Sequence, residues 1–126
     1  MKYTEIDSFL RDFKKLRKKF PSLNKDLETV KKTVIELCHI NKIDNQSVFE
    51  LKGFNNNKNV TFWKIKKFAC KSLKGRGVKS GIRIIYAYHN DQEKVVFLEI
   101  YFKGNKDNED HGRIRYYLSE IINTPK

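Results

Sequence analysis

Apolar residues recur at steps of three and four positions in two N-terminal stretches, from Thr4 to Phe20 and from Leu23 to Cys38. This spacing places them on one face of an α-helix. The apolar positions are Ile6, Phe9, Leu10, Phe13, Leu16 and Phe20, followed by Leu27, Val30, Val34 and Leu37. Pro21 ends the first helix, and the short link after it predicts an antiparallel helical hairpin.

The pattern changes after the second helix. Residues Asn41 to Asn59 are polar and predict a loop, in which Val48 to Gly53 forms a turn or a short strand. Strand-length β-branched and aromatic segments then follow, separated by turn residues, and predict an antiparallel meander. These segments are Thr61 to Phe68, Gly81 to Tyr88 and Lys94 to Lys103. A short C-terminal helix from Ile114 to Ile122 completes the pattern.

These elements predict an α+β fold in which the N-terminal helical hairpin packs on a twisted antiparallel β-sheet. The length of 126 residues fits a single domain spanning residues 1–126, because it provides enough chain for one modest core. Alternation along the last strand gives an apolar row that we expect the helices to cover. This row consists of Val96, Leu98, Ile100 and Phe102.

The opposite face of the predicted sheet gathers polar and charged side chains. We expect it to present Lys64, Lys66, Arg83, Phe97, Glu99, Tyr101 and Lys103. Such a set suits cleavage of RNA by transesterification, in which a 2′-hydroxyl attacks the adjacent phosphate. Arg83 is suited to clamp a phosphate through two oxygens. A lysine whose pKa is lowered by its neighbours, Lys64 or Lys66, would be the base, with Glu99 as the other candidate. Alternatively, these lysines only protect the edges of strands.

The composition adds a charge argument. The chain carries 27 Lys and Arg against 15 Asp and Glu, which gives a formal net charge of +12 and a pI near 9.7. This balance is typical of proteins that bind nucleic acids, although it also fits a solubilising surface or an acidic protein partner. Arg76 and Lys79 in the loop between two strands, with nearby Lys67, are candidates for contact with an RNA backbone, or else belong to a solvated loop.

Other function classes find less support. No apolar stretch approaches the length of a membrane span, and the N-terminus lacks the apolar region of a signal peptide, so we expect a cytoplasmic protein with no membrane partner. Cys38 and Cys70 are isolated and predict buried thiols, while His39, His89 and His111 are scattered and predict ordinary surface or capping residues. We therefore expect no metal site and no cofactor.

Four motifs in order resemble the RelE/ParE toxin superfamily. They are Phe13 to Leu23, Trp63 to Lys66, Lys79 to Tyr86 and Leu98 to Lys103. The resemblance implies the fold described above and, for RelE-like members, metal-independent cleavage of messenger RNA on the ribosome, which inhibits translation. It also implies a cognate antitoxin protein as partner. The positions that match the functional residues of such toxins are Lys64, Lys66, Arg83, Tyr101 and Lys103.

Two alternatives remain open from the sequence. The ParE branch of the superfamily inhibits DNA gyrase and requires no catalytic set. A non-catalytic module would use the same basic surface only to bind RNA phosphates. The strand lysines together with Arg83 favour the nuclease.

Overall fold

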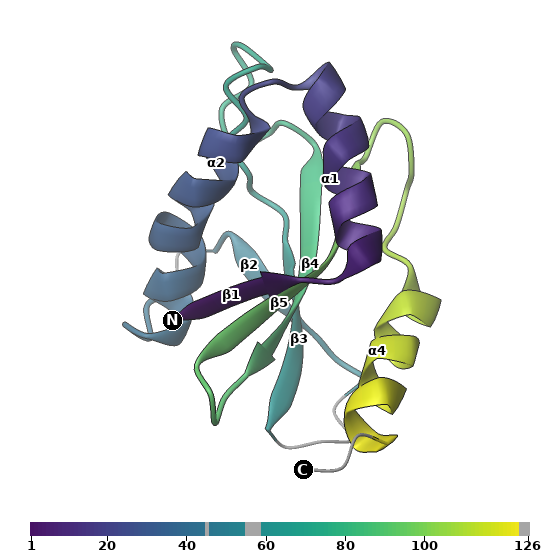
Figure 1. Cartoon of the computed structure of the whole chain (residues 1–126). Coiled ribbons are helices and arrows are strands. Elements are labelled where there is room, and N and C mark those ends of the chain that lie inside the picture. Colours follow the sequence, from purple (N-terminus) through teal and green to yellow (C-terminus); the bar gives the residue numbers. More distant parts are fainter. Residues whose placement is uncertain (45, 55–58, 124–126) are drawn as a thin grey trace.

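A computed structural model describes residues 1–44, 46–54 and 59–123 of the chain (Figure 1). Residues 45 and 55–58, which belong to the predicted loop, lie outside the described residues. The elements in chain order are β1 (Lys2–Glu5), α1 (Asp7–Lys19), α2 (Leu23–Val30), the π-helical segment η1 (Lys31–Glu36), α3 (Leu37–His39), β2 (Val48–Leu51), β3 (Val60–Ile65), β4 (Ile82–His89), β5 (Lys94–Phe102) and α4 (His111–Asn123). The expected α+β class is thus confirmed.

The sheet has five strands in the order β1-β5-β4-β3-β2, not the three predicted. The central meander β3-β4-β5 is antiparallel, as expected, and β2 joins it as an antiparallel edge strand within the predicted loop. At the other edge, β1 runs parallel to β5. The first helix therefore begins at Asp7 and not at Thr4. The pattern concealed β1 because most of this strand is exposed and polar, while its Tyr3 ring stacks on Phe97 at 6.0 Å.

The predicted N-terminal helical hairpin is not confirmed as such, because the chain opens with a strand. The first helix ends before Pro21, and the segments α2, η1 and α3 continue one another from Leu23 to His39, close to the predicted range. The packing differs from that of a simple hairpin. Helix α1 lies mainly against β5 and contacts α2 little, because its Phe9 ring stacks on Phe97 at 5.2 Å.

A β-bulge corrects the predicted faces of β5. Ile85 pairs with Glu99, whereas the next residue, Tyr86, pairs with Phe97, so Leu98 is the extra residue. Before the bulge, the Phe97 side chain faces α1, although we had expected it on the polar face of the sheet. The predicted apolar row is therefore divided between the two faces of the sheet. Val96 and Leu98 lie on the α4 face, while Ile100 and Phe102 lie on the opposite face.

Two hydrophobic clusters hold these layers together. The larger one lies between the sheet and the helices α1, α2 and η1; its residues include Phe9, Leu23, Ile35, Ile65, Ile84, Tyr86 and Phe97. The smaller one lies under α4 and includes Phe62, Ile85, Ala87, Leu98, Ile114 and Leu118. Because α4 covers only part of its face, the ends of β3 and β5 and the start of β4 meet a loop instead, residues 103–110 (Figure 1).

Candidate functional site

The register of the sheet brings the predicted site residues together on the α4 face. Lys64 pairs with Ile85, which pairs with Glu99, so these side chains form one row across β3, β4 and β5. Two residues further along, Arg83 pairs with Tyr101 in the next row. We call Lys64, Arg83, Glu99 and Tyr101 the strand cluster. Its members come from three strands, so the sheet itself positions them.

Lys64 is the most enclosed cation of the cluster. Its side chain is only 11% exposed, and its Nζ lies 2.6 Å from Oε1 of Glu109. Burial lowers the pKa of the ammonium, but the neighbouring Glu109 carboxylate and Tyr101 phenol outweigh burial, so that the pKa lies above its usual value. Lys64 therefore remains charged. The expectation that Lys64 has a lowered pKa and acts as the base is wrong for this arrangement.

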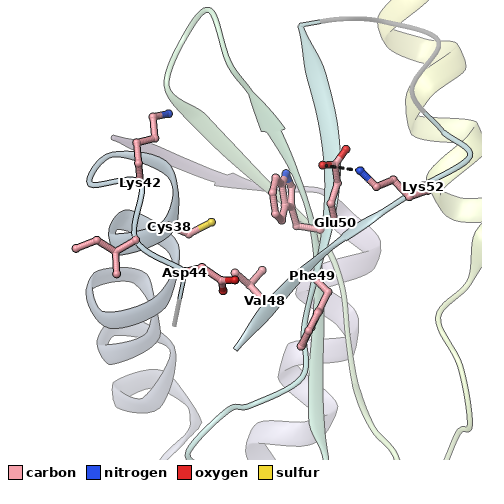
Figure 2. A pocket seen from close by; sticks show the side chains of 9 residues that line it. Cys38, Lys42, Asp44, Val48, Phe49, Glu50 and Lys52 are labelled. Carbon is pink, nitrogen blue, oxygen red and sulfur yellow. Dashed lines mark hydrogen bonds and ion pairs between the residues drawn. The ribbon is translucent and has the colours of Figure 1, made fainter. Parts of the chain in front are cut away.

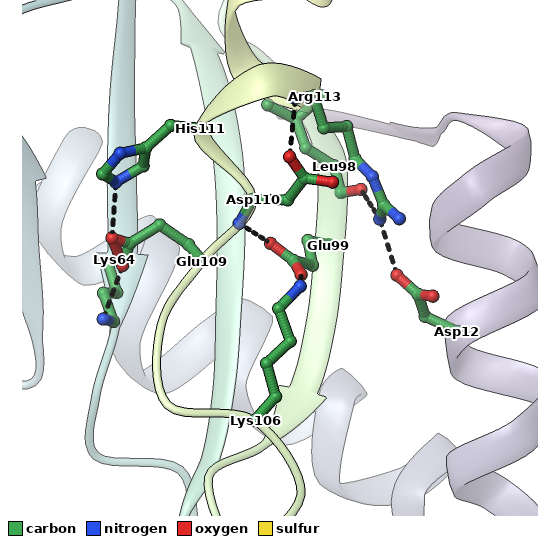
Figure 3. Close-up of polar contacts among 9 residues, drawn as sticks. All are labelled: Asp12, Lys64, Leu98, Glu99, Lys106, Glu109, Asp110, His111 and Arg113. Carbon is green, nitrogen blue, oxygen red and sulfur yellow. Dashed lines mark hydrogen bonds and ion pairs between the residues drawn. The ribbon is translucent and has the colours of Figure 1, made fainter.

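Glu109 joins the strand cluster to helix α4. Its Oε1 accepts the hydrogen bond from Lys64, and its Oε2 lies 2.9 Å from Nε2 of His111 (Figure 3). Burial alone would raise the pKa of this carboxyl group, but the hydrogen bonds from Lys64 and His111 dominate and leave the pKa below its usual value. Glu109 is therefore an ionised carboxylate between the Lys64 ammonium and the His111 imidazole.

Glu99 has a different role from the one considered in the sequence. It is 3% exposed, its Oε1 accepts a hydrogen bond of 2.8 Å from the backbone N–H of Asp110, and its Oε2 pairs with Nζ of Lys106 (Figure 3). Both carboxylate oxygens are thus occupied by the loop that follows β5. Glu99 anchors this loop to the sheet and is less available as a base.

Tyr101 places a hydroxyl in the interior of the site. The residue is 6% exposed, and its hydroxyl makes no hydrogen bond with the described residues. The ammonium groups of Lys64 and Lys106 lie 5.9 and 5.5 Å from the centre of its ring. A buried hydroxyl costs about 1–3 kcal/mol unless a water molecule or a ligand completes its hydrogen bond.

Arg83 and Lys66 lie at the outer edge of the cluster. The Arg83 guanidinium donates a hydrogen bond of 2.7 Å to the carbonyl oxygen of Lys66, which follows the end of β3. The Lys66 ammonium stands 4.9 Å above the ring of Phe49 on β2. Phe49 pairs with Lys64 and so shares its face. The predicted Lys66 and Arg83 therefore adjoin Lys64, with most N–H groups of the Arg83 fork still available to an anion.

The remaining predicted residues are more peripheral. Lys103 follows β5 and is exposed, with its backbone N–H bonded to the carbonyl oxygen of Gly81 at 2.8 Å. Lys67, Arg76 and Lys79 are exposed in the segment that joins β3 to β4. Within the described chain, no hydrogen bond or ion pair connects their side chains to the strand cluster. These exposed side chains form a basic border of the site and do not belong to its interior.

Sequence reasoning missed the residues of the loop after β5. Asp110 accepts the backbone N–H of Arg113 at 3.1 Å and so caps the N-terminus of α4. Arg113 contacts Asp12 at 2.6 Å and the carbonyl oxygen of Leu98 at 2.9 Å, which fixes α4 to α1 and β5 (Figure 3). The available signal was the acidic run before His111, which marks a helix start.

The other two histidines are buried, contrary to the expectation of surface or capping residues. His39 bonds to the Tyr86 hydroxyl at 2.7 Å and stacks on Tyr88, and burial lowers its pKa to about 4. His89 bonds to the Tyr117 hydroxyl at 2.7 Å. Both histidines are thus buried side chains that each bond to a tyrosine hydroxyl. Of the cysteines, Cys70 is buried as expected, whereas Cys38 is half-buried, and both are free thiols.

A separate groove of about 550 Å³ lies along β2, near the end of the helical segment (Figure 2). Cys38, Val48 and Trp63 contribute its apolar surface, and the Glu50–Lys52 ion pair stands at its rim. Trp63 alternates with Lys64 along β3 and faces away from the strand cluster, whereas Phe49, which also lines the groove, shares the face of Lys64.

The described part of the chain holds no group of three or more His, Cys, Asp or Glu side chains placed to bind a metal ion. No helix in the described ranges has the length and apolar character needed to cross a membrane.

The structure is similar to that of a chain in the archaeal RelE–RelB complex from Pyrococcus horikoshii OT3. The TM-score is 0.47 and the sequence identity 12%, over 82% of this chain and 94% of that chain. No family model matches the sequence, and no curated protein matches it significantly. The similarity in structure therefore comes with little similarity in sequence.

Proposed function

We propose that this protein is a metal-independent endoribonuclease that cleaves messenger RNA on the ribosome and so inhibits translation, as the toxin of a type II toxin–antitoxin system. One observation carries the proposal. The enclosed Lys64 ammonium lies near the Tyr101 ring, whose hydroxyl has no hydrogen-bond partner among the described residues, with Arg83 in the next row. A site with two cations and a free hydroxyl donor suits the oxygens of a phosphodiester.

The roles follow from the geometry. Lys64 stays charged and stabilises the negative charge that develops on the phosphoryl oxygens during attack by the 2′-hydroxyl. Arg83 binds two of the phosphate oxygens through its planar fork. Tyr101 donates its hydroxyl to the same group and so gains the hydrogen bond it lacks in the free chain. The exposed Lys66 and Lys103, with Lys67, Arg76 and Lys79 beside them, attract the flanking phosphates.

The partners follow from charge. A formal net charge of +12 attracts RNA and the ribosome, and it equally suits an acidic antitoxin that neutralises the basic surface. Three of the four motifs that carry the RelE/ParE resemblance contain the residues of the strand cluster, which further supports a toxin of this kind.

Inducible expression in a bacterial host tests the proposal. Wild type is compared with Arg83→Ala and with Arg17→Ala, a matched control that removes an exposed arginine of α1. Growth, protein synthesis and transcript ends are followed together. We expect wild type and Arg17→Ala to arrest growth with cuts inside coding regions, and Arg83→Ala to do neither.

Two other results would contradict the proposal. Arrest by all variants with intact transcripts and induced DNA damage would indicate a gyrase inhibitor. Salt-dependent RNA binding without arrest or cleavage would indicate a binding module.

A further inference from the structure

His111 stands where a base is needed. It is the first residue of α4, and its side chain is 50% exposed, so one edge of the imidazole faces solvent. Its other edge contacts the ionised Glu109, whose opposite oxygen holds Lys64 (Figure 3). The ring of Phe54 lies 5.5 Å away and limits the movement of the imidazole. An imidazole, a carboxylate and an ammonium thus form a continuous chain at the edge of the strand cluster.

The carboxylate determines which nitrogen of His111 is available. An ionised carboxylate only accepts hydrogen bonds, so Nε2 of the imidazole must donate to Glu109. In the neutral ring, the lone pair then lies on Nδ1, away from Glu109. The same contact stabilises the imidazolium that forms when Nδ1 takes a proton. This arrangement orients and strengthens a base.

We propose that His111 is the general base of RNA cleavage and that Glu109 is the residue that positions it. The inference rests on the proposed ribonuclease function. Nδ1 of His111 takes the proton of the 2′-hydroxyl as the O2′–P bond forms. The P–O5′ bond breaks, the departing O5′ takes a proton from water, and the products are a 2′,3′-cyclic phosphate and a 5′-hydroxyl. No electrons are exchanged with another reagent.

The other candidates for the base are less suitable. Lys64 keeps its proton because Glu109 holds it in the charged form. Glu99 has both oxygens engaged by Lys106 and the backbone of Asp110. The roles therefore divide, with Lys64 stabilising charge and His111 moving the proton.

The charged groups around His111 determine its titration. Glu109 contacts the imidazole directly and favours the charged form. Lys64 lies on the far side of that carboxylate. Arg115, on α4, stands 5.5 Å above the ring of Phe54, which in turn packs on His111. The nearest charge is therefore the carboxylate, and its removal takes away the charge that stabilises the imidazolium.

The test measures cleavage of labelled messenger RNA on programmed ribosomes under single-turnover conditions, across a range of pH. The variants are His111→Ala and Glu109→Gln, with Tyr116→Ala as a control at an exposed position of the same helix. We expect the wild-type rate to rise with pH and level off above the imidazole pKa. His111→Ala should be slower by roughly 100-fold or more and lose this inflection, with partial rescue by added imidazole.

The Glu109→Gln variant distinguishes a role of Glu109 in positioning His111 from a purely structural role. We expect its inflection to move to lower pH, because the imidazolium loses its neighbouring charge, whereas a merely structural role would lower the rate at every pH without moving the inflection. If wild type cleaves and His111→Ala cleaves equally with the same pH profile, the inference is wrong while the ribonuclease stands. Absence of cleavage by wild type overturns both.

Discussion

The pair formed by Lys64 and Glu109 illustrates how much a single residue depends on its partner. Both side chains are largely enclosed, at 11% and 8% exposure. Breaking such a pair leaves one buried charge without compensation, which costs more than the pair contributes as a whole. The site therefore relies on this contact for its structure as well as for the charge state of Lys64.

This contact makes a prediction about stability. Lys64→Met should lower the free energy of unfolding by about 2–3 kcal/mol, because the buried Glu109 loses its ammonium partner and keeps only its contact with His111. The double variant Lys64→Met/Glu109→Gln should recover most of that loss. Urea denaturation of the three proteins measures the effect, and a double variant no more stable than Lys64→Met would show that the pair is not coupled.

A second residue gives the molecule a pH dependence. His39 is buried against Tyr86 and Tyr88, and burial lowers its pKa to about 4 from a usual value of 6.5. Above pH 6.5 neither state binds the proton. Between pH 6.5 and 4 the unfolded chain binds it and the folded chain does not, so stability falls as the pH falls, by up to about 3 kcal/mol.

Replacement of His39 checks this assignment. We expect His39→Gln to flatten the dependence of the unfolding free energy on pH over this window, with the residual slope arising partly from His89, whose pKa is also lowered by burial. An unchanged slope in His39→Gln would mean that another group carries the dependence. Denaturant titrations at intervals across the window provide the measurement.

At the residue scale, the sequence predicted the strand cluster but not its surroundings. Alternation along three strands correctly placed Lys64, Arg83 and Tyr101 on one face, because the period of two is a local property. Glu109 and His111 were missed because they reach the site from the loop after β5 and from the first position of α4, where no period marks them. Their contact with Lys64 depends on how α4 is anchored, which no local pattern encodes.

At the scale of the elements, the predictable part was again the part with a strong period. The first helix, the long second helical segment, the meander and α4 all appear near their predicted ranges. Of the two edge strands, β1 did not appear in the prediction because it is mostly exposed, and the short β2 was expected only as a turn or a short strand within the loop. The bulge in β5 was not predicted either. Alternation treats the strand as unbroken, whereas one extra residue moves every later side chain to the other face of the sheet.

The bulge leads to a prediction that distinguishes the observed position of Phe97, facing α1, from the position on the polar face that alternation predicted. Phe97 is fully buried against α1, so Phe97→Ala should destabilise the protein by about 3–5 kcal/mol. Phe49→Ala removes the same ring from a position that is 42% exposed and should cost less than about 1 kcal/mol. Thermal unfolding of both variants measures the difference. Similar losses would contradict the register described for β5.

For the whole molecule, the excess of positive charge predicts how RNA binding responds to salt. If the phosphates of single-stranded RNA contact Lys64, Lys66 and Arg83, the logarithm of the association constant should fall with the logarithm of salt concentration at a slope of about −2. Arg83→Ala should reduce the magnitude of this slope by about 0.7. Fluorescence anisotropy with a labelled oligonucleotide gives both slopes. An identical slope for Arg83→Ala would remove this residue from the binding surface.

The parallel pairing of β1 with β5 has a consequence for biosynthesis. Lys2 lies opposite Lys94, so β1 leaves the ribosome long before β5, the strand that completes it, has been made. The ring of Phe9 likewise can stack on Phe97 only after β5 has been made. Contacts between such distant positions in the chain favour slow, late folding. A nascent chain that stalls before β5 therefore lacks the strand on which β1 folds, and only a chain extended beyond β5 assembles the strand cluster.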